Sequence, residues 1–196
     1  MSEDLAWAIE NMSSQDRSLR PLSSEIIHKS WEDALPLLLD IVRGNNTYRQ
    51  EIAVGILYGF FRDYGLRHPD LVPVLVKAIE SNINNDLLVS QEGIAFLADL
   101  KDPSAFDDFI RFIQADSDIL RDGAVEGLGL LADARAISYL VKTLKDEIET
   151  IRSMASWALR RIVEQNPSDV ELIKTELRKS ESAEAVELLK QLENNQ

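Results

Sequence analysis

Hydrophobic residues recur in the second half of the chain with the spacing of a helix that buries one face. Positions i, i+3, i+4 and i+7 are apolar in two segments that begin 31 residues apart, the pattern of an amphipathic helix. These positions are Phe106, Phe109, Ile110 and Ile113 in the first segment and Ile137, Leu140, Val141 and Leu144 in the second. No stretch alternates apolar and polar residues for long enough to predict a strand. The pattern therefore predicts helices throughout.

A second helix follows each of these segments and repeats at the same interval. Its pattern begins with an arginine and continues with small or apolar residues, so that Arg121, Ala124, Gly127, Leu128 and Leu131 correspond to Arg152, Ala155, Ala158, Leu159 and Ile162. The pattern recurs at Ser90, Gly93, Phe96, Leu97 and Leu100, and another 41 residues earlier at Arg49, Ile52, Gly55, Ile56 and Gly59. A repeated helix pair indicates a solenoid.

First helices also match in the earlier half, where Leu35, Leu38, Leu39 and Val42 correspond to Val72, Leu75, Val76 and Ile79. We therefore predict an all-α fold, an α-solenoid of about four helix pairs in a single domain over residues 1–196. The pairs cover 31–65, 69–101, 102–132 and 133–165, and capping helices occupy 1–30 and 167–196. Within the first cap, a Ser-rich stretch from Ser13 to Ser24 is expected to be irregular.

Helix starts are marked by residues that satisfy free backbone amides. Asp102 and Asp133 stand at equivalent places, where an N-cap side chain accepts from the first unpaired amides. Pro103 follows Asp102 and suits the first helical position, because the amide there has no helical partner. Both repeats are thus predicted to begin at an aspartate.

Two adjoining strings resemble short HEAT repeats, particularly the variety of the phycobilisome lyases. They are Leu120-Arg-Asp-Gly-Ala-Val-Glu-Gly-Leu-Gly-Leu-Leu-Ala-Asp-Ala-Arg-Ala-Ile137 and Ser138-Tyr-Leu-Val-Lys-Thr-Leu144. The resemblance is strong over residues 102–163 and looser over 31–101. It implies an α-solenoid whose first helices line the convex side and whose second helices line the concave, binding side. It says little about function, because fold and function are separable.

The chain is acidic, with 34 Asp and Glu against 21 Lys and Arg and a net charge of −13. Binding a phosphate backbone needs a basic face, so we expect neither nucleic acid nor an anionic membrane as a direct partner. The longest apolar run, Ile52–Phe61, is too short to cross a bilayer. The first residues carry Glu3 and Asp4 rather than the positive charge of a secretory signal. We expect a cytoplasmic protein.

None of the candidate catalytic motifs has the structural context or the partner residues that its chemistry requires. Gly127, Gly129 and Ala132 match the G-x-G-x-x-A dinucleotide fingerprint, but they lie within a predicted helix and not after a strand. The chain has no cysteine, and His28 and His68 have no sequence-local partner for a triad or a metal site. The iron-binding His-Glu pairs of the deoxyhypusine hydroxylases, which share this fold, are also missing. We therefore expect no enzyme activity, no catalytic residue, no metal and no cofactor.

Arginines at repeat-equivalent places, Arg49, Arg121 and Arg152, suggest either phosphate binding or a structural ladder between repeats. HEAT repeats commonly form such a ladder at this position, so the resemblance implies the structural role, with partners such as Asp118 or Glu149, and we favour it. Ion pairs on a surface contribute only about 0–1 kcal/mol each.

A binding surface remains as the candidate functional feature. The positions one, five and nine residues after the repeat arginine should face the concave side: Gln50, Val54 and Tyr58; Gln91, Ala95 and Asp99; Asp122, Glu126 and Leu130; and Ser153, Trp157 and Arg161. Aromatic residues and arginine dominate interface energies, so Trp157 is the leading candidate. The alternative is a tryptophan half-buried against the C-terminal helix. We select Tyr58, Asp99, Asp122, Glu126, Trp157 and Arg161 as protein-binding residues.

Two functions fit these features. In the first, the protein is a non-enzymatic binding module whose acidic concave face holds another, basic protein, and in one form it is an immunity protein or antitoxin that sequesters a basic toxin such as a nuclease. In the second, it is a bilin-lyase-type subunit or a maturation chaperone that handles a tetrapyrrole or a client protein. The acidic positions favour the first, because carboxylates steer a basic partner.

Overall fold

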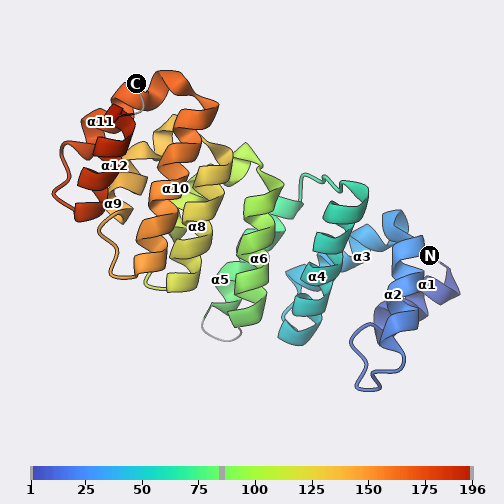
Figure 1. Ribbon diagram of the computed structural model, residues 1–196. Coiled ribbons are helices and arrows are strands. Elements are labelled where there is room, and N and C mark those ends of the chain that lie inside the picture. Colours follow the sequence, from blue (N-terminus) through green and yellow to red (C-terminus); the bar gives the residue numbers. More distant parts are fainter. Residues whose placement is uncertain (1, 84–86, 195–196) are drawn as a thin grey trace. The chain divides into compact units, whose positions relative to one another are not determined.

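A computed structural model describes residues 2–83 and 87–194, and every regular element within these ranges is helical (Figure 1). The all-α, α-solenoid prediction is confirmed, with four helix pairs between terminal helices. Contacts divide the chain into two compact units, Met1–Phe96 and Leu97–Gln196. The description as one domain stays a prediction.

In the N-terminal unit each helix packs on its sequence neighbour. The helices are α1 (Glu3–Asn11), α2 (Arg20–Lys29), α3 (Trp31–Arg43), α4 (Thr47–Tyr64), α5 (Leu71–Asn82) and α6 (Leu87–Leu100), which continues into the second unit. The stretch 13–24 is less irregular than expected, because α2 already begins at Arg20. Pro21 presets the helical φ angle there, and the buried hydroxyl of Ser23 donates to the Leu19 carbonyl at 2.9 Å.

The C-terminal unit alternates short first helices with longer second helices. Its elements are η1 (Pro103–Ala105), α7 (Phe106–Phe112), α8 (Asp118–Leu131), η2 (Ala134–Ala136), α9 (Ile137–Thr143), α10 (Glu149–Gln165), η3 (Pro167–Asp169), α11 (Val170–Leu177) and α12 (Ala183–Asn194). Figure 1 shows α8 and α10 side by side. The predicted caps are confirmed, since Asp102 and Asp133 accept from the amides of Ser104 and Arg135 at 2.9 and 2.8 Å.

Two glycines of α8 allow neighbouring helices to approach closely. A Cβ atom at Gly127 would overlap the ring of Phe109, which is fully buried. A Cβ atom at Gly129 would lie 2.6 Å from the Trp157 ring and 2.9 Å from the Ala158 Cβ. The G-x-G-x-x-A match is therefore a helix-packing feature, and no dinucleotide loop is formed there.

The predicted register of α4 is wrong by one residue. Its buried residues are Gln50, Ala53, Val54, Leu57 and Phe60, whereas Ile52 and Ile56 are half-buried and Gly55 is exposed. The counterpart of Ser90 is thus Gln50, 40 residues earlier, rather than Arg49. Gln50 and Val54 consequently belong to the core and not to an exposed binding face.

The reason for this register is a polar residue near the start of each second helix, which donates to a carbonyl of the preceding helix end or loop. Gln50 Nε2 donates to the Gly44 carbonyl at 2.7 Å, and Ser90 Oγ donates to the Ile79 carbonyl at 3.1 Å. Arg121 and Arg152 each use one terminal nitrogen in the same way, on Asp116 and Asp146 respectively, both at 2.8 Å. These bonds satisfy carbonyls that a helix end leaves unpaired. Arg49 instead donates to the Ile9 carbonyl of α1 at 3.0 Å.

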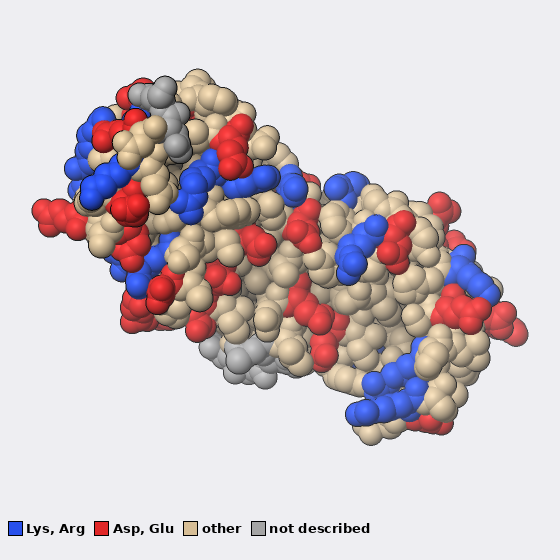
Figure 2. All heavy atoms as spheres, viewed as in Figure 1, with Lys and Arg blue, Asp and Glu red and all other residues tan. Residues whose placement is uncertain are grey.

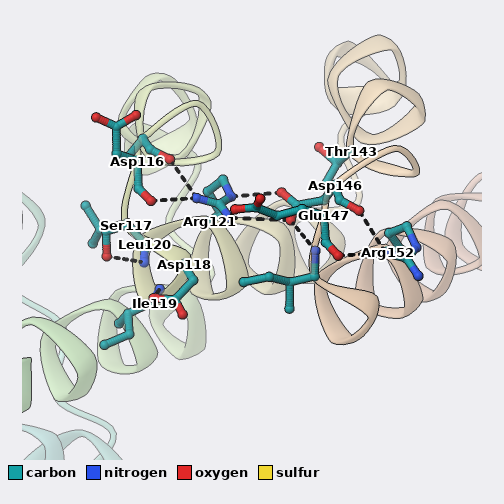
Figure 3. Close-up of polar contacts among 12 residues, drawn as sticks. Asp116, Ser117, Asp118, Ile119, Leu120, Arg121, Thr143, Asp146, Glu147 and Arg152 are labelled. Atoms are coloured by element: carbon teal, nitrogen blue, oxygen red, sulfur yellow. Dashed lines mark hydrogen bonds and ion pairs between the residues drawn. The ribbon is translucent and has the colours of Figure 1, made fainter.

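The predicted arginine ladder exists, but its acids differ from those expected. Arg121 Nε donates to Asp146 at 2.8 Å (Figure 3). Arg152 Nε donates to Glu184 at 2.5 Å, so each of these two arginines pairs with an acid further along the chain, and neither pairs with Asp118 or Glu149. The Arg121 and Asp146 side chains are only 12% and 10% exposed. This is a buried pair, and breaking it costs more than breaking a surface pair.

Burial and bonding oppose each other at Asp146. Burial raises its pKa, but the Arg121 guanidinium and the Ile148 amide outweigh that effect, so the pKa of Asp146 is lowered overall. A carboxyl whose pKa is lower in the folded state stabilises the fold above its ordinary pKa and loses that effect as pH falls through the folded-state value.

We expect Gly127→Ala to lower the free energy of unfolding by about 1–2 kcal/mol, because overpacking against Phe109 outweighs the gain in helix propensity. Gly55→Ala is the matched control, since the added Cβ meets only Glu92 Oε2 at 3.7 Å, and it should stabilise by up to about 1 kcal/mol. Urea unfolding followed by circular dichroism measures both. Equal effects of the two substitutions would contradict the packing role of Gly127.

Asp146→Asn should lower the free energy of unfolding at pH 7 by about 1–3 kcal/mol, since it leaves the largely buried Arg121 guanidinium with only the longer contact to the exposed Glu147, at 3.8 Å. The loss should begin to shrink below about pH 3.9, where the unfolded chain takes up the proton, and should disappear only below the lowered pKa of Asp146 in the folded state. Urea unfolding at pH 7 and pH 3 checks this. Glu25→Gln, in an exposed pair with Lys29, is the control and should leave the free energy of unfolding nearly unchanged. A pH-independent penalty for Asp146→Asn would contradict the charge argument.

Candidate functional site

The candidate site lies on the exposed face shared by α8 and α10 in the C-terminal unit. Thr150, Ser153, Met154 and Trp157 have the i, i+3, i+4, i+7 spacing of one helix face, so α10 presents them together. Asp122 and Glu126 follow each other by one turn on α8, the neighbouring helix. Figure 2 shows acidic side chains among uncharged ones over the lower part of this face.

Two adjoining hollows indent this face. The larger has a volume of about 490 Å³ and is lined by Glu126, Glu149, Thr150, Ser153, Met154 and Trp157. The smaller, of about 150 Å³, is lined by Asp118, Ile119, Asp122, Ile148, Thr150 and Ile151. Thr150 lines both hollows, so they lie next to each other on this acidic groove-like face.

Trp157 forms a wall of the larger hollow and is held from two sides. One edge of its ring packs on Gly129 of α8, and the Arg161 guanidinium lies 5.8 Å from the ring centroid. The ring is half-buried, as one alternative expected, but it packs on α8 and not on the C-terminal helix. Because packing fixes the ring, it offers a preorganised apolar surface to anything that enters the hollow.

The carboxylates around the ring are not neutralised by the protein. Burial raises the pKa of Glu126, and the nearby Asp99 and Asp122 raise it further. Burial and Asp118 likewise raise the pKa of Asp122. No described cation forms an ion pair with Asp122, Glu126 or Glu149. The face therefore keeps a concentrated negative charge that a positive ligand would relieve.

The structure gathers some of the six predicted binding residues and leaves others apart. Glu126 and Trp157 line the same hollow, Asp122 lines the adjoining one, and Asp99 is close enough to raise the pKa of Glu126. Arg161 contacts the Trp157 ring but lines neither hollow, and its Nε atom is buried without a partner. Their role in binding stays a prediction.

Tyr58 is in the N-terminal unit, where its half-buried ring stacks on Phe96 at a centroid distance of 4.9 Å. With the register of α4 corrected, the counterpart of Asp99, Leu130 and Arg161 is Gly59, one residue further along. The selection of Tyr58 as a binding residue stays a prediction as well.

Sequence reasoning missed Glu149, Thr150 and Met154, which line the larger hollow. The selected positions were one, five and nine residues after the repeat arginine. Residues at this spacing cover only part of the face that a helix exposes. Stepping back from Trp157 by three, four and seven positions would have found Met154, Ser153 and Thr150.

The two histidines have structural contacts. The His28 ring packs edge-on against Phe60 with a centroid distance of 5.2 Å, and its Nδ1 lies 2.8 Å from the Ser24 carbonyl. His68 Nδ1 accepts from the Asp70 amide at 3.2 Å. Within residues 2–83 and 87–194, no three His, Cys, Asp or Glu side chains are grouped as metal ligands. None of the described helices is both long and apolar enough to cross a membrane.

Comparison with solved structures identifies the fold. A chain from the complex of CpcE and CpcF of phycocyanin lyase from Nostoc sp. PCC7120 is similar, with a TM-score of 0.60 and 18% identity over 96% of this chain and 75% of that chain. Two engineered proteins are similar with TM-scores of 0.58 and 0.55, each at 16% identity. The matches cover 97% of this chain and 57% of the first engineered protein, and 98% of both chains for the second. At these identities the likeness concerns the fold alone.

Sequence comparison adds the repeat family. No curated protein matches this sequence significantly. The profile of the HEAT repeats matches residues 106–193, which include α7 to α11 and most of α12. The resemblance seen in the strings around Leu120 and Leu144 is thereby confirmed. Residues 106–193 of this chain match the model of the HEAT repeats.

Proposed function

We propose that this chain is a non-catalytic protein-binding module and that the face formed by α8 and α10 binds a basic protein. HEAT repeats commonly serve protein interactions, and the second helices carry the surface in question. The observation that supports the proposal most is the set of carboxylates without a cationic partner, Asp122, Glu126 and Glu149, around a fixed tryptophan. Interfaces use such aromatic anchors for affinity and charges for steering.

The electrostatic state of this face favours a positively charged partner. Burial and neighbouring carboxylates raise the pKa values of Asp122 and Glu126, so a cation at the face would be stabilised while it relieves that repulsion. The net charge of −13 extends the attraction over the approach to the surface. Such a complex associates fast at low ionic strength and weakens as salt rises.

A finer form of this proposal is an immunity protein or antitoxin that occupies a basic toxin, such as a nuclease. Nucleases that bind a phosphate backbone carry a basic surface. An acidic groove can cover that surface and so exclude the nucleic acid by competition. This form is tested by the activity of the captured partner, as described below.

The alternative is a lyase-type subunit or a chaperone that handles a tetrapyrrole or a client protein. It is supported by the fold likeness to the phycocyanin lyase chain. The larger hollow argues against tetrapyrrole binding, because Glu126 and Glu149 would repel the propionate groups of a bilin. The client-protein form shares the acidic face with the first proposal.

Reversing the charge of the face should abolish binding of the partner. We expect Asp122→Lys/Glu126→Lys, tagged and incubated with lysate of the native source, to lose a stoichiometric basic protein that the wild type retains. That protein should elute from the wild type as the salt concentration rises, because the attraction is screened. Mass spectrometry of the retained proteins measures this.

Glu164→Lys/Glu181→Lys is the matched control, since both residues are exposed and make the same change in net charge outside the two hollows. It should retain the partner. Assaying the purified partner for nuclease activity or toxicity, with and without this chain, tests the immunity role. Retention of the same proteins by both double variants would contradict the acidic face as the binding site.

A further inference from the structure

The larger hollow combines an apolar surface with negative charge in a way the rest of the groove does not. Trp157 and Met154 supply an aromatic ring and a thioether, while Glu126 and Glu149 supply two carboxylates from different helices. Thr150 and Ser153 add hydroxyl groups that can accept hydrogen bonds. The smaller hollow has carboxylates and isoleucines but no aromatic ring.

We propose that the larger hollow receives a single arginine side chain of the basic partner, with the guanidinium stacked on Trp157 and paired with Glu126 and Glu149. This inference rests on the proposed function and specifies the chemistry of its central contact. The methylene stem of the arginine covers Met154, and the hydroxyl groups accept from the remaining N–H donors.

Arginine fits these walls better than lysine does. The guanidinium is planar and weakly hydrated, stacks on aromatic faces and carries five donors that can serve two carboxylates at once. An ammonium group is a compact, strongly hydrated point charge with three donors and no planar face that could stack on an aromatic ring. The walls contain no cation that would attract an anionic ligand.

Contacts between a guanidinium and an aromatic ring already occur within the protein. The Arg161 guanidinium lies 5.8 Å from the centroid of the Trp157 ring, and that of Arg135 lies 3.9 Å from the Phe106 ring. Arg161 belongs to the helical turn after Trp157, whereas the hollow is lined from the turns before it. The part of the ring that borders the hollow is therefore left for a second guanidinium.

The groove between α10 and α12, of about 390 Å³, differs in that its charged residues already have partners. Glu184 accepts from Arg152 at 2.5 Å, and Arg160 donates to Gln191 at 3.1 Å. A ligand there would have to break these bonds. The unpaired carboxylates beside Trp157 make the larger hollow the stronger recognition site.

Amide NMR titration of the full ¹⁵N-labelled chain tests the inference with defined peptides. The probes are acetyl-Gly-Gly-Arg-Gly-Gly-amide, the same peptide with lysine, and the same peptide with citrulline, which has the shape of arginine without its charge. The arginine peptide should shift the Trp157 indole signal and the amides of Ser153 and Met154. The citrulline peptide should bind at least about tenfold more weakly than the arginine peptide, and the lysine peptide severalfold more weakly than the arginine peptide.

Variants assign the binding to the walls. Trp157→Leu and, separately, Glu126→Gln/Glu149→Gln should each weaken arginine binding about tenfold, read from the Ser153 and Met154 amides. Trp7→Leu and Glu164→Gln/Glu181→Gln are the matched controls and should leave it unchanged. The carboxylate variant keeps the test valid if Trp157→Leu disturbs the packing on Gly129.

The outcomes separate this inference from the proposed function. If a nona-lysine peptide shifts the Asp118 and Asp122 amides in a salt-sensitive way while the arginine peptide leaves the Trp157 indole unmoved, the arginine site is wrong and the acidic face stands. Equal affinity for the arginine and citrulline peptides also overturns the arginine site. If neither basic peptide shifts any signal of α8 or α10, both the arginine site and the acidic face are overturned.

Discussion

The Arg121–Asp146 contact is the interaction on which the arrangement of the C-terminal unit depends. One guanidinium closes the loop before its own helix, through the carbonyls of Ala115 and Asp116, and also pairs with the loop before the next second helix. Arg152 makes the same two kinds of contact: it donates to the carbonyls of Asp146 and Glu147 in the loop before α10, and it pairs with Glu184 of α12. The Arg121–Asp146 pair is largely withdrawn from water, so it is stronger and more directional than an exposed ion pair. It ties α8 to the loop before α10, while Arg152 ties α10 to α12.

Fixing those two helices is what makes a site out of their exposed face. Gly129 lets α10 approach α8 so closely that the Trp157 ring packs on α8, and the Arg161 guanidinium lies over the same ring. Glu126 reaches the same hollow from α8. A binding surface carried by packed helices is rigid, so a partner loses little free energy in ordering it.

The charges on this face are arranged differently from those elsewhere in the unit. Arg121 and Arg152 are engaged in holding the repeats together, and the carboxylates they bind, Asp146 and Glu184, have lowered pKa values. Asp122 and Glu126 have no such partner, and their pKa values are raised. The protein thus neutralises the acids that hold its structure and leaves those of the exposed groove open to a ligand, which is the electrostatic basis of the binding proposal.

The sequence by itself determined the helical class, the 31-residue repeat of the last two pairs and the aspartate caps, because these depend on local periodicity and on backbone amides within one turn. It also indicated an arginine ladder, through the equivalent positions of Arg121 and Arg152 and the resemblance to HEAT repeats. Tertiary structure decided the register of α4, the acids of the ladder and the residues that line the hollow. Gln50 is buried in the core at the repeat position that corresponds to Arg121. The equivalence is visible only from the loop carbonyls to which each side chain donates. The hollow likewise combines side chains from two helices, and their meeting depends on how closely Gly129 lets those helices pack.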